Sequence, residues 1–226
     1  MKLMEKEDIA KIIDHTYLKA SATEGDIRRV CQEAVKYNFR SVCIHPRWVK
    51  LAKEELRETQ VKVVVVIDWP CGASPVDVRY FAAKIAKNDG ADEADPVMDI
   101  GNFKDGNYEL VLQDLKILSN ILPCKVIIET GFLTDEEIKT ASKLVKESGA
   151  ICVKTSTGQD PKTDVNTKLL HIKLMREAVG PDFLIKAAGG VATLEDAQRM
   201  VGAGADIIGA SSSLKILGFS LKEIAY

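Results

Sequence analysis

Short apolar runs alternate with amphipathic segments along nearly the whole of this 226-residue chain. Residues 61–67 are almost all valine, and residues 150–153 form a similar run bounded by turn residues. Such runs are typical of strands buried on both faces of a parallel sheet. Between the runs, apolar residues recur at helical spacing, as Ile27, Val30 and Ala34 do. The pattern predicts strands that alternate with helices.

Eight short strands are expected, at residues 14–16, 40–44, 61–67, 91–100, 125–130, 150–154, 183–186 and 205–209. Helices are expected around them, at residues 5–13, 23–37, 48–58, 75–88, 108–122, 134–147, 167–179 and 193–201. Thr23, Thr134 and Thr193 each stand three positions before an acidic residue, a pattern that caps helix N-termini.

Strict alternation of strand and helix implies a parallel sheet with right-handed crossovers. Eight such units in about this length favour a TIM (β/α)8 barrel over an open doubly wound sheet. We therefore expect one domain over residues 1–226, with a short leading N-terminal helix. In such barrels the active site lies at the C-terminal ends of the strands.

The composition, 46% hydrophobic and 28% charged, is that of an ordinary globular enzyme with a sizeable core. A formal net charge of −2 gives no electrostatic case for binding nucleic acid or an anionic membrane. No apolar run is long enough to span a membrane, and the charged N-terminus is unlike a signal peptide. The five cysteines are scattered, as reduced thiols are in cytosolic proteins. We expect a cytoplasmic protein.

Two of the expected strands end in a lysine that small residues and glycine follow. These are Lys154 and Lys186, about one strand-helix-strand repeat apart, so we expect them at the same end of adjacent strands. A buried ammonium is costly unless it is paired or partly neutral. Two lysines held close together keep one amine neutral and nucleophilic. The pair predicts a Schiff-base lysine beside a second cation; the alternative is two surface lysines in exposed salt bridges.

The strand at residues 91–100 carries an unusual row of acids. Alternation places Glu93, Asp95 and Asp99 on one face. A carboxylate at this position can relay protons, and we favour Asp95 because it lies in the reactive half of the strand. The alternative is a salt bridge in the barrel interior.

Glycine and hydroxyl residues follow the last two strands, where the barrel's usual phosphate site lies. Gly189 and Gly190 follow the seventh strand, and Gly209, Ser211 and Ser212 follow the eighth. Backbone amides in such loops and at a helix N-terminus can hold an anion. The sequence thus predicts a phosphosugar site.

Four further residues complete the predicted substrate-binding set: Asp14, Cys43, Thr157 and Gly158. For Cys43, at the end of the second strand, packing is the alternative. The histidines His15, His45 and His171 lack metal-ligand spacing, and no HExxH or paired CxxC motif is present. No metal is therefore expected, and a lysine Schiff base needs no organic cofactor, so none is expected either.

Taken together, these motifs resemble those of the deoxyribose-phosphate aldolases, over nearly the whole chain. The matching segments are IDHT (13–16), SVCIHP (41–46), GADEADPVMDIG (90–101), KVIIET (125–130), VKTSTG (153–158), IKAAGG (185–190) and IGASS (208–212). The resemblance implies a class I aldolase that interconverts 2-deoxy-D-ribose 5-phosphate with acetaldehyde and D-glyceraldehyde 3-phosphate, in deoxyribonucleotide catabolism. It implies a Schiff base on Lys154, a perturbing cation on Lys186 and a proton relay on Asp95.

The chain departs from that family at three places. Asp99 and Ala192 stand where its members often carry Asn and Arg, and the loop at residues 159–162 differs from the usual run of small residues. Two other functions stay open: a Schiff-base lyase or transaldolase acting on another phosphosugar, and a non-catalytic phosphosugar binder. A homo-oligomer, either a dimer or a tetramer, is also expected.

Overall fold

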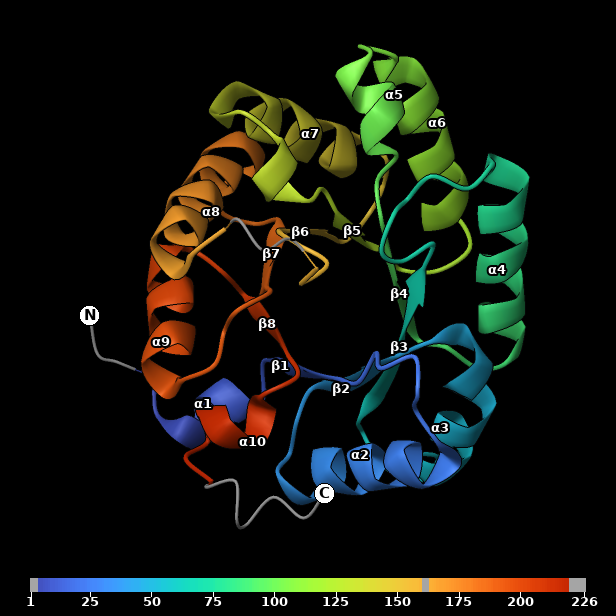
Figure 1. The fold of residues 1–226 in the computed structure, drawn as a ribbon, viewed down its shortest axis with the longest axis vertical. Helices are drawn as coiled ribbons and strands as arrows, with labels where there is room; N and C mark the ends of the chain where they lie inside the picture. Colours follow the sequence, from blue (N-terminus) through green and yellow to red (C-terminus); the bar gives the residue numbers. More distant parts are fainter. Residues whose placement is uncertain (1–3, 160–162, 220–226) are drawn as a thin grey trace.

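The computed structural model describes residues 4–159 and 163–219. Eight parallel strands form one sheet in the order β4-β3-β2-β1-β8-β7-β6-β5, with helices around them (Figure 1). The predicted TIM barrel is thereby confirmed. The strands are β1 (Ile13–Thr16), β2 (Ser41–Ile44), β3 (Lys62–Ile67), β4 (Glu93–Pro96), β5 (Lys125–Ile127), β6 (Cys152–Lys154), β7 (Leu184–Ala188) and β8 (Ile207–Ala210).

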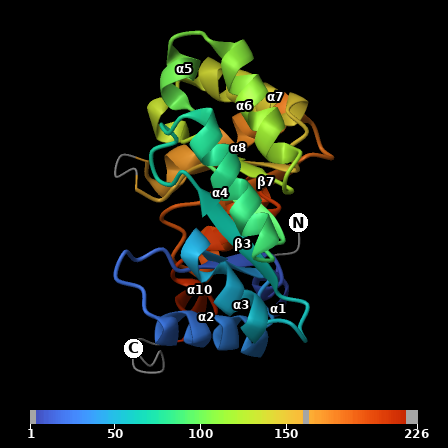
Figure 2. The same ribbon diagram turned by 90° about the vertical axis from the view of Figure 1, so that its right-hand side faces the viewer.

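The expected helices all form, and Figure 2 shows how α4 crosses the outside of the sheet in front of β3. Thr23, Thr134 and Thr193 each make the predicted capping box. The helices are α1 (Lys6–Ala10), α2 (Glu24–Lys36), α3 (Val49–Glu55), α4 (Val76–Asn88), α6 (Tyr108–Ser119), α7 (Asp135–Glu147), α8 (Val165–Val179) and α9 (Leu194–Ala203). Within the described part of the chain, no helix is both long and apolar enough to cross a membrane.

Four short elements were not predicted: the helices α5 (Ile100–Lys104) and α10 (Ser213–Ile216), and the 3₁₀ turns η1 (Pro46–Trp48) and η2 (Thr130–Phe132). The expected strand at residues 91–100 is wrong in extent, because β4 ends at Pro96. Asp99 instead caps α5 by accepting a hydrogen bond from the Asn102 amide at 2.9 Å. Proline cannot donate to a strand ladder and aspartate favours helix starts, so both residues oppose a longer strand.

The ring of strands closes between β4 and β5 through two isolated bridges, Ala94 with Cys124 and Val97 with Ile127. We call this junction the seam. The backbone hydrogen bonds across it include those from the Ala94 amide to the Pro123 carbonyl and from the Met98 amide to the Ile127 carbonyl. The other strand pairs share regular parallel ladders.

The main hydrophobic core lies between the sheet and the helices. In β3, Val63, Val65 and Ile67 belong to this core, while Val64 and Val66 form a small separate cluster with Cys43. Strand alternation therefore sends half of each strand inward. Much of the remaining inward-facing set is charged, and it forms the site described next.

Candidate active site

Three carboxylates and three lysines form one buried cluster inside the barrel. Strands β1 and β4 supply the carboxylates, and β5, β6 and β7 each supply one lysine. All six side chains are buried. We call them the interior charge cluster: Asp14, Glu93, Asp95, Lys125, Lys154 and Lys186.

Lys154 and Lys186 are direct register partners in β6 and β7, which confirms the predicted juxtaposition. Their ammonium nitrogens contact the same oxygen, Oδ2 of Asp95, at 2.7 and 2.8 Å. Lys154 alone of the three lysines also reaches the wall of a cavity above. The pair thus places one amine at the cavity and one beneath it.

Lys186 is held as a fixed cation. It donates to Oδ2 of Asp14 as well as to Asp95. Burial alone would lower the pKa of Lys186, but these two carboxylates outweigh it and raise the pKa. Asp14 also accepts from Ser41 Oγ at 2.6 Å and from Arg40 Nη1 at 2.8 Å. Asp14 therefore positions Lys186 from below, and it does not line the cavity.

Lys125 is the cluster member that sequence reasoning missed. Its Nζ lies 2.6 Å from Glu93 Oε2 and 3.0 Å from Asp95 Oδ1, so these ion pairs cross the seam from β5 to β4. Burial would lower the pKa of Lys125, but the carboxylates, Asp95 foremost, outweigh burial and raise it. The available signal was a lysine opening the otherwise apolar run at residues 125–128, on the strand before that of Lys154.

Asp95 is an ionised carboxylate at the centre of the cluster. Burial would raise its pKa, but Lys125, Lys154 and Lys186 hold the pKa well below the usual range. The Cys43 thiol lies 3.9 Å from Asp95 Oδ2 and is fully buried. Burial raises the pKa of this thiol. Cys43 thus packs beneath the cavity instead of lining it.

A cavity of about 410 Å³ lies at the C-terminal ends of the strands, above the interior charge cluster. Eight of the predicted site residues lie in its wall: Lys154, Thr157, Gly158, Gly189, Gly190, Gly209, Ser211 and Ser212. The other four, Asp14, Cys43, Asp95 and Lys186, lie outside it. Sequence reasoning missed four contributors from the end of β1 and from the loops after β1 and β3: Thr16, Leu18, Lys19 and Trp69.

The glycine loop after β7 leaves amides without partners. Gly189 and Gly190 both adopt φ of +79°, a conformation that side chains oppose. In the described residues, the Gly190 and Val191 amides make no hydrogen bond. The next two amides, those of Ala192 and Thr193, bond to the Asp196 carboxylate at 3.4 and 3.1 Å. The amides just before α9 therefore already have a hydrogen-bond partner, and the amides without a partner belong to the loop.

The loop after Lys154 is held from two sides at the Thr157 backbone. Its amide donates to Glu129 Oε2 at 2.8 Å, and its carbonyl accepts from Trp69 Nε1 at 3.3 Å. Glu129 is buried and has φ of +47°, an uncommon conformation for a residue other than glycine. These contacts fix the loop that carries Thr157 and Gly158 over the cavity.

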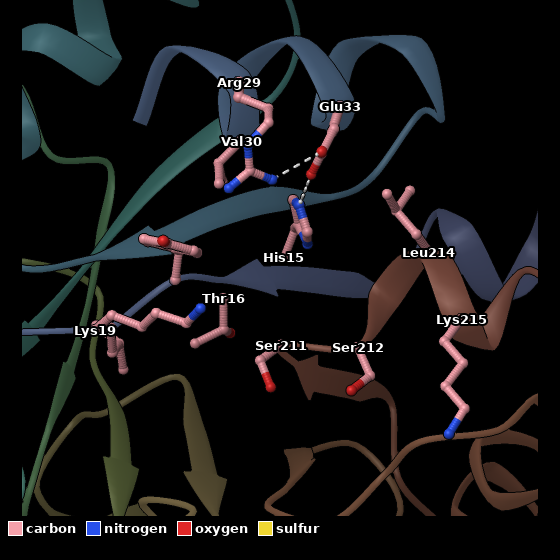
Figure 3. A pocket seen from close by; sticks show the side chains of 12 residues that line it. His15, Thr16, Lys19, Arg29, Val30, Glu33, Ser211, Ser212, Leu214 and Lys215 are labelled. Carbon is pink, nitrogen blue, oxygen red and sulfur yellow. Dashed lines mark hydrogen bonds and ion pairs between the residues drawn. The ribbon is translucent and has the colours of Figure 1, made fainter. Parts of the chain in front are cut away.

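A smaller cavity of about 270 Å³ adjoins the first and shares Thr16, Leu18, Lys19, Ser211 and Ser212 with it. Figure 3 shows His15 beneath Glu33, whose Oε2 is 2.8 Å from the ring nitrogen Nε2. The other ring nitrogen is 2.9 Å from Ser213 Oγ. Among the described residues, no group of three or more His, Cys, Asp or Glu side chains is arranged to hold a metal ion.

Comparison with known proteins gives a consistent result. The profile of the DeoC/LacD family aldolases matches residues 9–218. The deoxyribose-phosphate aldolase of Thermococcus gammatolerans is 48% identical over 217 residues, 93% of this chain and 95% of that protein. The Clostridium perfringens enzyme of the same name is 45% identical over 227 residues, 99% of this chain and all of that protein.

Among solved structures, the deoxyribose phosphate aldolase of Aeropyrum pernix superposes with a TM-score of 0.84 at 32% sequence identity. The match covers 94% of this chain and 91% of that one. The structure of that protein is described as tetrameric.

Proposed function

The chain belongs to the DeoC/LacD family of aldolases, and from this premise we propose that it cleaves 2-deoxy-D-ribose 5-phosphate reversibly to D-glyceraldehyde 3-phosphate and acetaldehyde, through a Schiff base on Lys154. The observation that carries the proposal is one carboxylate oxygen shared by two lysines, of which one reaches the cavity. A protein that only bound a phosphosugar would have no use for such a pair. The product and substrate classes fit a role in deoxyribonucleotide catabolism in the cytoplasm.

The charge balance of the interior has room for one neutral amine. Three lysines and the partly buried Arg40 face three carboxylates in the cluster, so loss of one proton equalises the charges. Lys62 also contacts Glu93, but its side chain is half exposed and its charge is screened by solvent. Lys154 is the lysine at the cavity, so its amine is the one that a substrate carbonyl can reach.

The reaction then proceeds on Lys154 Nζ. The neutral amine attacks C1 of the open-chain aldehyde, and loss of water gives a protonated imine. The imine accepts the electron pair of the C2–C3 bond as that bond breaks, and the C3 hydroxyl loses its proton to become the aldehyde of D-glyceraldehyde 3-phosphate. The remaining enamine takes a proton at carbon and is hydrolysed to acetaldehyde. Asp95, 2.7 Å from Nζ, accepts and returns protons through water.

The phosphate end is proposed to lie against the loops after β7 and β8. Gly190 and Val191 lie in the wall of the cavity, and their unbonded amides can hold an anion without a helix N-terminus. Ser211 and Ser212 lie in the same wall and offer hydroxyl donors. In the described residues, a Cβ at Gly190 would meet no atom within 4 Å, so the space beside this loop is open.

Borohydride trapping tests the proposed function. Incubation with acetaldehyde and borohydride should fix a two-carbon adduct on one lysine, and peptide mapping should place it on Lys154. Omitting acetaldehyde is the control. An adduct on Lys186 would reverse the two roles, and an unmodified protein that also fails to cleave deoxyribose 5-phosphate would refute the proposal.

We also propose that the chain forms a homo-oligomer through α4 and α6. Seven of the eleven large apolar side chains that are exposed in the described residues lie on these two helices, Phe81 most openly at 62%. Asp77 and Lys84 flank Phe81 on the exposed side of α4. A two-fold axis at Phe81 would therefore set Asp77 against Lys84 of a second copy, which makes the face self-complementary.

This assembly is tested by Phe81→Asp, which should lower the molar mass measured by light scattering during gel filtration. Leu170→Asp, on the exposed part of α8, is the matched control and should not change it. An unchanged mass for Phe81→Asp would place the interface elsewhere.

A further inference from the structure

We propose that Lys19 supplies the positive charge that recognises the phosphate group of the substrate. This inference rests on the proposed function and adds to it a residue outside the loops after β7 and β8. Among the described residues, the wall of the larger cavity contains two charged side chains, Lys154 and Lys19, and no carboxylate. Lys154 is bound to Asp95 at the floor. Lys19 is thus the charged side chain of the cavity wall that lies away from the floor.

The chain path places Lys19 beside the phosphate loops. Lys19 follows β1, and β1 pairs in parallel with β8, with Asp14 opposite Gly209. The loop after β1 therefore runs next to the loop that carries Ser211 and Ser212. Figure 3 shows the Lys19 side chain extending toward Thr16, with Ser211 and Ser212 beyond it.

Lys19 has no carboxylate partner in the described structure, and its ammonium only approaches the Tyr17 ring, 5.6 Å from the centroid. Arg29 approaches the same ring at the same distance. Its guanidinium, however, contacts Asp26 at 3.3 Å and Glu33 at 3.0 Å. Of these two cations, Lys19 is therefore the one left to pair with a bound anion.

The amides of the glycine loop explain why a separate cation is needed. Gly190 and Val191 offer two neutral donors, and Ala192 brings no charge to the same wall. A dianion is stabilised more by a charge-assisted contact than by neutral donors, roughly twofold in strength. An ammonium on a flexible stem also reaches an anion without a fixed geometry. Lys19 meets both requirements from the loop after β1, in the wall of the same cavity.

The test compares two substrates on four proteins: the unaltered enzyme, Lys19→Gln, Lys19→Arg and Lys215→Gln. Lys215 is exposed and lines only the smaller cavity, so its replacement removes an equal charge close by. The substrates are deoxyribose 5-phosphate and unphosphorylated deoxyribose, and kcat/KM is measured for each.

For Lys19→Gln we expect kcat/KM on the phosphorylated sugar to fall about 10- to 100-fold, mainly through KM, with little change on deoxyribose. Lys19→Arg should retain most of the preference for phosphate. Lys215→Gln should leave the ratio of the two constants as it is in the unaltered enzyme. Inorganic phosphate, as a competitive inhibitor, should bind correspondingly more weakly to Lys19→Gln.

Equal losses on both substrates in Lys19→Gln would overturn the inference, because Lys19 would then shape the mouth in general. Equal effects of Lys19→Gln and Lys215→Gln would also overturn it, because phosphate binding would then depend on the total positive charge near the cavity and not on a contact with Lys19. The proposed function fails separately, when the unaltered enzyme neither cleaves the sugar nor forms the borohydride-trapped adduct.

Discussion

The two layers of the barrel interior use the same residue types for different ends. In the lower layer, near the strand N-termini, Glu93 accepts from Arg40, Lys62 and Lys125 at 2.6–2.7 Å. In the upper layer, Asp95 accepts from Lys154 and Lys186 through a single oxygen. The lower layer surrounds one carboxylate with three cations, and none of them lines the larger cavity. The upper layer ends at the cavity.

What separates the layers is access to the cavity, since both are built from carboxylates and cations that share carboxylate oxygens. Glu93 Oε1 accepts from Arg40 and Lys62, and Oε2 accepts from Arg40 and Lys125, but none of these cations lines the larger cavity. The two upper amines divide one oxygen of Asp95, and one of them meets solvent. Chemistry therefore belongs to the upper layer and stability to the lower.

Replacing Lys154 with Met, in the upper layer, should have the largest effect on activity of all the substitutions considered. Without a nucleophile, turnover should fall by about 10⁴-fold or more, as for other covalent catalysts. The fold should persist, because Asp95 keeps its contacts with Lys125 and Lys186. Steady-state rates and thermal unfolding measure the two effects.

Lys125→Met is the matched control in the lower layer. Removing one partner of a buried ion pair leaves uncompensated charge and should cost about 3–5 kcal/mol of unfolding free energy. The protein that remains folded should still trap acetaldehyde on Lys154. If folded Lys125→Met formed no adduct, the division between the layers would be wrong.

Lys186→Leu should affect the upper layer less than loss of the nucleophile does. Losing a fixed electrostatic group is expected to slow the reaction about 10²- to 10³-fold near neutral pH. The optimum should move to higher pH, because no neighbouring cation then favours the neutral form of Lys154. A pH–rate profile supplies the measurement, and an unchanged profile would exclude this role for Lys186.

The lower layer should make the free energy of unfolding depend on pH in acid. Burial would raise the pKa of Glu93, but Lys125 and Arg40 outweigh it and lower the pKa from 4.5 to about 2. A depressed pKa adds stability above pH 4.5 that disappears as the pH falls through about 2. The contribution at neutral pH is about 3 kcal/mol. Urea unfolding between pH 2 and 7 should show this decline, and Glu93→Gln should flatten it.

The smallest effect is expected for Cys43→Ala, which tests whether this residue belongs to packing or to the cavity. Cys43 is fully buried beside Val64 and Val66, so losing its sulfur should cost about 1 kcal/mol of stability. Substrate KM should change little. A large rise in KM with unchanged stability would return Cys43 to the substrate-binding set.

Sequence reasoning predicted the barrel and the Lys154–Lys186 pair because both follow from local patterns: strand-helix alternation and a repeated strand ending. It extended β4 to Asp99 because alternation alone does not weigh Pro96 or a helix cap. It missed Lys125, because a lysine at the start of a strand usually faces solvent, and only closure of the ring brings it to Glu93. Trp69 and Lys19 were missed for a related reason. The sequence does not show which loops meet at the cavity, because this depends on three-dimensional packing.

The seam between β4 and β5 has a consequence for how the molecule moves. Two isolated bridges, which include the hydrogen bonds of the Ala94 and Met98 amides, and the ion pairs of Lys125 hold it together, whereas the other strand pairs have continuous ladders. Regions with few backbone bonds open at the lowest free energy, well before global unfolding. These two amides are thus the natural place for hydrogen exchange to begin in the ring of strands. Because Asp95 lies between them on β4, each such opening would let water reach the carboxylate from the side opposite the cavity.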